Sequence, residues 1–330
     1  MLSRRAVGLL EQLAAEGVSP WLADVSGVEL LAGAQGDPAG VETAFLQGVV
    51  APVASSAAVR RSCDALRDVF HASEGVHGRV SVPVDPRHAH DAKALIAAAR
   101  SRRSEVGRAN VLMRIPVTRA GLVALEECLA LGIGVDADLV FSVERYEELL
   151  DVVLRGLERA FMAGLPLADI VATASVPVGL LDAEVNARLA ALPVRGPAGA
   201  AAATAAARGT AALAVARQIY RAREQRLGSD WWRVLRAAGA MPPGLLWTAT
   251  GPRHVGALVG WNTAQAASPE VFETAARQVE LRGDTLLNAH AEGRGALDAL
   301  EALGVRMAEV AEVLETGTLA RLQREWGRGA

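Results

Sequence analysis

Short apolar runs alternate with longer helical patterns along most of the chain. The runs are rich in Val, Ile and Leu and are bounded by turn residues, as buried parallel strands are. We expect strands at residues 20–24, 48–51, 79–84, 110–115, 133–141, 170–175, 245–248 and 257–261. Because helical patterns separate these runs, the sequence predicts eight βα units and a (β/α)8 TIM barrel.

Several helices can be placed from local signals. Ser142 precedes an amphipathic pattern over 143–163 and is expected to be its N-cap. The alanine-rich segment 195–217 predicts a helix with small side chains, entered after a Gly-Pro loop. Additional N- and C-terminal helices flank the barrel in this interpretation. We expect a single domain over 1–330, with the barrel at about 19–275 and a C-terminal helical extension at about 279–326.

Composition narrows the function classes. Hydrophobic residues make up 51% of the 330 residues and charged residues 22%, which is typical of a chain with a large core. The net charge of −3 provides no overall basic field, so we expect no nucleic-acid partner. No run of apolar residues is long enough to predict a membrane span. The N-terminal segment has acidic residues and is not typical of a signal peptide, so we expect a cytoplasmic protein.

The chain is poor in reactive side chains. Cys63 and Cys128 lie in separate helical patterns and form no CxxC motif, which argues against a disulfide framework and against a zinc site. Lys93 is the only lysine, and all other strongly basic side chains are arginines.

Longer stretches of the sequence resemble the transaldolase family. Members of this family are Schiff-base-forming enzymes that act on sugar phosphates and have a (β/α)8 barrel. The stretches that carry the resemblance are SPWLADVSGVELL, RVSVPVDPRHAHD, NVLMRIPVTRAGLVALEECLALGIGVDADLVFSVERYEELL, ARGTAALAVARQIY, LLWTATGPR, GWNTA and LEALGVRMAEVAEVLETGTLARL. They follow in order from about residue 19 to residue 323. The resemblance implies a barrel whose ligand site lies at the carboxyl ends of the strands.

The motifs that mark the active site in this family are matched in position but altered in content. Ala23 occupies the place of the proton-relaying Asp, and Asp24, one residue on, is expected to point the other way. Pro52 lies in the stretch that matches a substrate-binding Asn, and Pro83 replaces a Glu. Leu180 replaces the phosphate-binding Arg.

The fourth strand carries the most consequential change, because Arg114 stands where the resemblance implies the Schiff-base lysine. A guanidinium stays protonated at physiological pH and has no lone pair to offer as a nucleophile. A lysine can do this chemistry because burial lowers its pKa. We therefore expect transaldolase activity itself to be absent. Lys93, on the helix after the third strand, is expected to lie in solvent.

Two aspartates take up the charge lost elsewhere. Asp136 and Asp138 align with the Asn and Thr of the family's fifth strand, and Ser175 is retained on the sixth. Together with Arg114 the aspartates sum to −1, as in the family pattern of two carboxylates and one lysine. Residues 136 and 138 share one face of a strand and Arg114 points inward beside them, so a bidentate Arg–Asp pair is expected.

This charged group has two interpretations that the sequence leaves open. In the first, Arg114 binds an anionic or carbonyl oxygen while Asp136, Asp138 and Ser175 serve acid/base chemistry. This would be a divergent carbohydrate-related enzyme that converts a small polar metabolite, sugar-derived or otherwise, without a covalent intermediate. In the second, the group is a buried ion pair left after catalysis was lost, in an inactive homologue that acts as a binding or regulatory protein.

Further substrate-binding candidates flank these strands. Arg253 and His254 follow the expected seventh strand, and Asn262 follows the expected eighth. The loop 85–91 contains His88 and His90, but the resembling family stretch holds no metal, so we expect no metal and no cofactor. The expected partner is a small polar metabolite, sugar-derived or phosphorylated; a membrane is not expected, and oligomerisation stays open.

Overall fold

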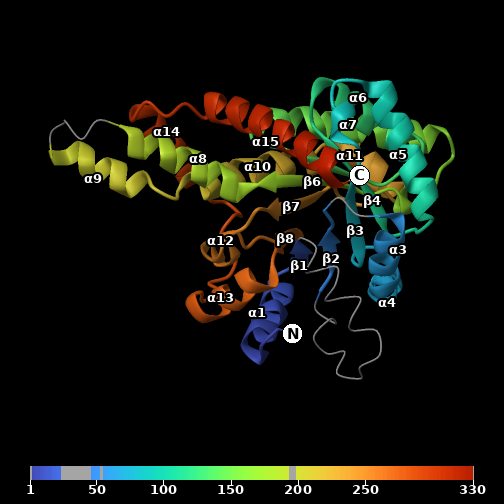
Figure 1. Cartoon of the computed structure of the whole chain (residues 1–330), viewed down its shortest axis with the longest axis horizontal. Coiled ribbons are helices and arrows are strands. Elements are labelled where there is room, and N and C mark those ends of the chain that lie inside the picture. Colours follow the sequence, from blue (N-terminus) through green and yellow to red (C-terminus); the bar gives the residue numbers. More distant parts are fainter. Residues whose placement is uncertain (1, 24–45, 53–54, 193–197, 330) are drawn as a thin grey trace.

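The computed structural model describes residues 2–23, 46–52, 55–192 and 198–329. Eight parallel strands form a closed barrel in sequence order, which confirms the predicted (β/α)8 TIM barrel (Figure 1). The strands are β1 (Val18–Ala23), β2 (Gly48–Val50), β3 (Arg79–Pro83), β4 (Val111–Pro116), β5 (Val135–Asp138), β6 (Ala172–Pro177), β7 (Gly244–Thr248) and β8 (Thr263–Ala267).

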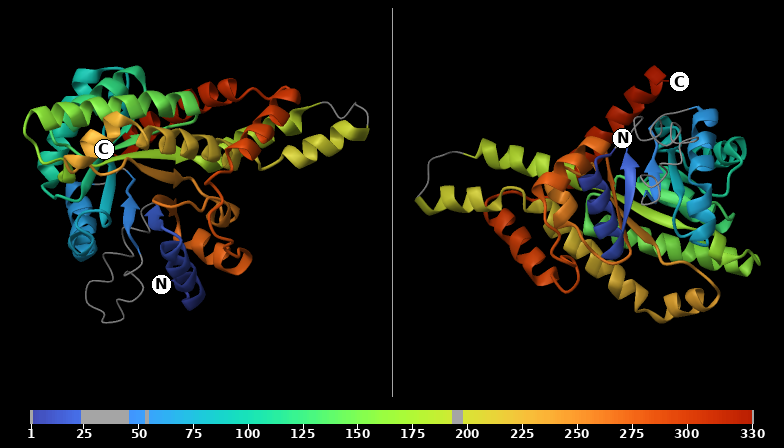
Figure 2. Two further views of the ribbon diagram at one scale, coloured as in Figure 1. Left: turned by 180° about the vertical axis from the view of Figure 1, so that it is seen from behind. Right: turned by 90° about the horizontal axis from the view of Figure 1, so that it is seen from below.

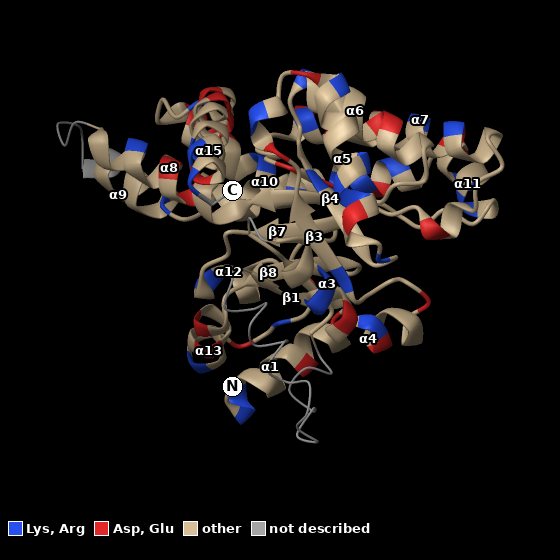
Figure 3. Ribbon diagram, turned by 45° about the vertical axis from the view of Figure 1, so that its right-hand side comes forward, with Lys and Arg blue, Asp and Glu red and all other residues tan. Residues whose placement is uncertain are grey.

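Helices surround the barrel, extend from it and carry most of the charged residues (Figure 3). They are α1 (Arg4–Ala15), α3 (Ser56–Ala65), α4 (Arg67–Ala72), α5 (Ala92–Val106), α6 (Arg119–Ala130), α7 (Val143–Met162), α8 (Val178–Ala191), α9 (Ala198–Ala207), α10 (Ala211–Leu227), α11 (Asp230–Ala237), α12 (Pro252–Ala257), α13 (Pro269–Gln278), α14 (His290–Ala302) and α15 (Met307–Gly329), with 3-10 turns η1 (Pro86–His88) and η2 (Leu167–Asp169). Within the described residues, no helix is both long and apolar enough to cross a membrane.

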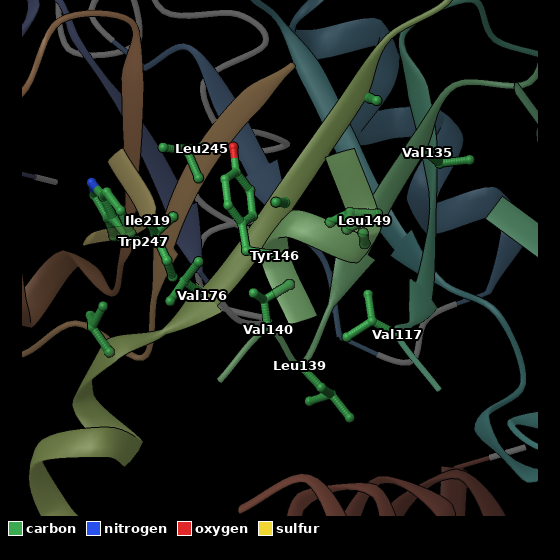
Figure 4. Packing of buried hydrophobic residues seen from close by; sticks show 14 of the residues in the cluster. Val117, Val135, Leu139, Val140, Tyr146, Leu149, Val176, Ile219, Leu245 and Trp247 are labelled. Atoms are coloured by element: carbon green, nitrogen blue, oxygen red, sulfur yellow. The ribbon is translucent and has the colours of Figure 1, made fainter. Parts of the chain in front are cut away.

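Alternation along each strand separates two hydrophobic layers. On β4, Leu112 faces an interior cluster with Trp21 and Leu246, whereas Val111 and Met113 pack into the layer between barrel and helices. Figure 4 shows part of the outer layer, where Val176, Trp247 and Ile219 belong to one buried cluster. Because position 112 points inward, position 114 on the same strand also points inward.

The local helix signals hold for α7. The Ser142 hydroxyl accepts a hydrogen bond from the Arg145 amide over 3.1 Å, which confirms the predicted N-cap. The alanine-rich segment, in contrast, forms two helices, α9 and α10, separated where Gly209 adopts φ +68°. Residues 195–197 of the predicted helix lie outside the described residues. Helices α8 and α9 form an arm that extends away from the barrel (Figure 2).

The eighth strand is displaced from its predicted position. Residues 252–257 form α12, residues 258–262 connect, and the strand is Thr263–Ala267 rather than 257–261. The apolar residues Leu258 and Val259 are buried between helix and strand, which explains why they resemble a strand. The real β8 contains small residues and Gln265, whose side-chain amide donates to the carbonyls of Val255 and Leu258. Because Gln265 is polar, residues 263–267 do not form the apolar run by which the other strands were predicted.

Helix α15 reaches the carboxyl-terminal end of the barrel. The Gln323 side-chain amide donates to the Pro86 carbonyl over 3.1 Å, just after β3. A cavity of about 250 Å³ separates residues of α15, such as Leu319, from Val117 and Leu139, which follow β4 and β5. The C-terminal extension therefore borders the mouth of the barrel. At the other end of the molecule α1 lies beside α13 (Figure 2).

Candidate functional site

Asp136 is the most deeply buried acid of the barrel. It has no exposed surface, and both of its carboxylate oxygens accept hydrogen bonds. The Ser81 hydroxyl of β3 donates to Oδ2 over 2.5 Å, and the Ser175 hydroxyl of β6 donates to Oδ1 over 2.7 Å. Burial, followed by repulsion from Asp138, raises the pKa of Asp136 to about 6. Arg114 and the two hydroxyls oppose this shift.

Asp138 lies two residues further along the same strand, closer to the mouth. Its side chain is 18% exposed, and Oδ1 accepts a hydrogen bond from the Leu139 amide over 2.8 Å. Leu139 has a positive φ of 67°, which marks the end of the strand. Burial raises the pKa of Asp138, while the charges of Arg114 and Arg321 and the Leu139 amide lower it.

Arg114 joins two strands instead of forming the expected bidentate pair. Its Nε lies 3.6 Å from Asp138 Oδ2, and Nη2 donates to the Ala51 carbonyl of the β2 end over 2.6 Å. The barrel register places Arg114 beside Asp136, but the serine hydroxyls already occupy both oxygens of that carboxylate. Among the described residues, the buried Nη1 group has no hydrogen-bond acceptor. Within this part of the chain, Nη1 of Arg114 is therefore a donor to which an anionic or carbonyl oxygen is the matching acceptor.

The positions with altered family motifs offer no replacement chemistry. Ala23 ends β1 and packs against the interior cluster, and Pro83 ends β3 beside Arg114. Pro52 follows β2, and Leu180 packs against the outer core near the start of α8. Asp24 lies outside the described residues.

The only lysine lies on a surface helix and not on a strand of the barrel. Lys93 is exposed on α5, the helix that follows β3, as expected from the sequence. Arg114 occupies the inward position of β4 instead. No lysine therefore projects into the barrel.

Arg253 and His254 lie on α12, after β7, beside a separate cavity of about 370 Å³ between α8 and α12. His254 Nδ1 accepts a hydrogen bond from the Gly251 amide over 2.9 Å, and Nε2 lies 3.1 Å from Asp182 Oδ2. Because Nδ1 accepts, Nε2 carries the proton and donates to the carboxylate. His254 has both ring nitrogens engaged, whereas Arg253 is exposed at the cavity.

Asn262 is not at the mouth. It precedes β8, and its backbone amide donates to the Gly17 carbonyl, just before β1. This places it at the amino-terminal ends of the strands, so its expected position after the eighth strand is wrong. The error follows directly from the displaced assignment of that strand.

The structure adds two residues that sequence reasoning missed. Ser81 shares the inward face of β3 with Pro83, and this period-two spacing was the available signal. Arg321 lies on α15, where its charge lowers the pKa of Asp138, and no local pattern in the sequence links it to β5. In the described part of the chain, no group of three potential metal ligands comes together.

Comparison with known proteins supplies the relatives of this barrel. Residues 50–328 match the family model described as Transaldolase/Fructose-6-phosphate aldolase. Transaldolase 1 of Streptomyces avermitilis is 37% identical over an alignment of 357 positions, gaps included, which covers 96% of this chain and 93% of the relative. Transaldolase 2 of the same organism is 38% identical, covering 82% and 73% respectively. A transaldolase of Mycolicibacterium smegmatis is 37% identical, covering 81% and 72%.

Proposed function

Since the chain belongs to the Transaldolase/Fructose-6-phosphate aldolase family, we propose that it is a carbohydrate-related enzyme that works without a covalent imine. The observation that carries this proposal is Arg114 at the inward position of β4, with no lysine in the barrel. The substrate is a small polar metabolite, sugar-derived or phosphorylated, bound at the carboxyl ends of the strands.

In this proposal Arg114 binds an oxygen of the substrate and Asp138 transfers the proton. The free Nη1 donor of Arg114 binds a carbonyl or alkoxide oxygen and stabilises the negative charge that develops on it. Asp138 is the more accessible carboxylate and exchanges a proton with the substrate. This chemistry suffices for aldol cleavage, isomerisation or dehydration.

Asp136 and Ser175 lie deeper in the barrel than Arg114 and Asp138 and have secondary roles in this proposal. The raised pKa of Asp136, about 6, lets this carboxyl group hold a proton near neutral pH. Ser175 donates to Asp136 and keeps lone pairs with which it can accept a hydrogen bond from a substrate hydroxyl. Arg253, exposed at the neighbouring cavity, is the remaining candidate for a phosphate group, with His254 beside it.

A second function is favoured by one observation, the complete burial of Asp136 with both oxygens occupied. An acid held in this way can be a structural element of an inactive homologue that binds a sugar phosphate or a protein. In that case the Arg114–Asp138 pair preserves the folded barrel and no reaction depends on it.

A ligand screen distinguishes the two functions. We expect a sugar phosphate or keto acid to raise the Tm of the wild-type protein and to be converted. Asp138→Asn should bind the same compound without turning it over, whereas Arg233→Gln, an exposed change on α11, should behave as wild type. Binding with no turnover by the wild-type protein would favour the inactive homologue, and the absence of any hit would count against both.

A further inference from the structure

A further cavity lies at the amino-terminal end of the barrel, opposite the mouth. It has a volume of about 510 Å³ and is lined by segments that precede or begin β3 to β6. Arg79 is the first residue of β3, while Ala109, Gly132 and Ile170 lie just before β4, β5 and β6. None of the residues of the candidate site lines this cavity.

Arg79 is the buried charge of this cavity. It is only 3% exposed, its Nε donates to the Gly75 carbonyl over 2.8 Å, and its guanidinium carbon lies 5.2 Å from the centre of the Phe70 ring. Within the described residues, its Nη groups make no other hydrogen bond and no carboxylate oxygen lies within 4.0 Å. Burial lowers the pKa of Arg79 to about 10; the charge of Asp169 opposes this shift and that of Arg103 adds to it.

A second guanidinium, that of Arg103, lines the same cavity from the last turn of α5. Its Nη1 donates to the Arg108 carbonyl over 2.5 Å, and its charge repels that of Arg79. The acidic residues of the lining, Glu74 and Asp169, are exposed and form no ion pair with either arginine in the described part of the chain. The cavity thus brings together two cations with no direct carboxylate partner.

We propose that this cavity is a binding site for a phosphate-class anion, held between Arg79 and Arg103. A buried cation is costly unless an opposite charge reaches it, and guanidinium groups match the oxygens of phosphate through paired N–H donors. The volume suits a small metabolite, so the anion is inorganic phosphate or the phosphate ester of such a metabolite. This site does not depend on the function proposed for the mouth.

Phosphate titration of the full chain tests the site. At constant ionic strength, inorganic phosphate should raise the Tm of the wild-type protein in a saturable manner, and chloride should not. Arg79→Gln and Arg103→Gln should abolish the rise, whereas the exposed Arg233→Gln and the mouth variant Arg114→Gln should retain it. Glycerol 3-phosphate distinguishes the two sources, because a lower half-saturation concentration for the ester than for phosphate identifies a metabolite ester as the ligand.

Two results would overturn the inference. One is the absence of a saturable rise with either anion, and the other is an unchanged rise in Arg103→Gln. An unchanged rise in Arg103→Gln together with its loss in Arg114→Gln would place the phosphate at the mouth. Arg103 is partly exposed, so this variant decides the question even if Arg79→Gln does not fold.

Discussion

Arg114 Nε lies 3.6 Å from Asp138 Oδ2, although the strand register places Arg114 directly beside Asp136. Each oxygen of Asp136 instead accepts one hydrogen bond from a serine hydroxyl, Oδ2 from Ser81 and Oδ1 from Ser175. The two aspartates of β5 therefore have different environments: Asp136 is fully buried inside the barrel, whereas Asp138 is partly exposed at the mouth. A pair of carboxyl groups separated in this way is suited to distinct roles in proton transfer.

Asp136 makes folding stability depend on pH. Its folded pKa of about 6 lies above 3.8, the ordinary pKa of an aspartate, so the folded state binds the proton more tightly than the unfolded state. Its stabilising contribution is fully present below pH 3.8 and is lost as the pH rises through about 6. The shift corresponds to roughly 3 kcal/mol. In urea unfolding between pH 4 and 7, Asp136→Asn should flatten this decline.

An unchanged slope in Asp136→Asn would mean that another group causes the decline. Asn can keep one acceptor and one donor for the two serine hydroxyls, so the variant is expected to fold. Asp230→Asn, at an almost fully exposed position on α11, is the matched control.

Removal of Arg114 should destabilise the barrel most at neutral pH. In Arg114→Gln both aspartates lose their nearest cation, and breaking a buried pair costs roughly 3 kcal/mol. At pH 5 the loss should be smaller, because Asp136 is then largely protonated. Urea unfolding at pH 7.5 and pH 5 measures the difference. An equal loss at both pH values would show that packing, and not charge, explains the effect.

The two serines control the protonation of Asp136. Ser81→Ala and Ser175→Ala each remove a hydroxyl that lowers the pKa of this carboxyl group. Each variant should raise the pKa of Asp136 further, and each should cost roughly 2 kcal/mol at pH 7.5, as for a hydrogen bond to a charged group. Carboxyl ¹³C NMR titration reports the pKa. Ser73→Ala, on the far side of the barrel, should leave the pKa of Asp136 unchanged. A wild-type pKa of Asp136 in both Ser81→Ala and Ser175→Ala would refute this role of the two serines.

Helix α15 acts on the mouth through Arg321. The positive charge of Arg321 lowers the pKa of Asp138, so Arg321→Gln should raise that pKa. The same NMR titration measures it, with Arg306→Gln at the start of α15 as the control. If both variants leave Asp138 unchanged, α15 does not contribute to the electrostatics of the site.

The barrel was predictable from the sequence because seven of its strands lie in short apolar runs that helical patterns separate. The eighth was misplaced because Gln265 breaks that pattern, and Asn262 was assigned to the wrong end of the barrel as a result. Arg114, Asp136 and Asp138 were predicted to lie together because period-two alternation and strand order determine their positions. The different environments of Asp136 and Asp138 were not predictable, since they depend on hydrogen bonds that Ser81 and Ser175 donate to Asp136 from other strands. That residues 1–330 form a single domain stays a prediction.

Reductive trapping is the most direct test of an enzyme that forms no imine. The protein is incubated with fructose 6-phosphate and borohydride, and its intact mass is measured beside that of Streptomyces avermitilis transaldolase 1, the positive control. We predict that the mass of this chain does not change, because Arg114 occupies the inward position of β4 and Lys93 lies on the outer surface. A stoichiometric sugar adduct on the wild-type protein would contradict the account, and its loss in Lys93→Arg would place the imine on Lys93.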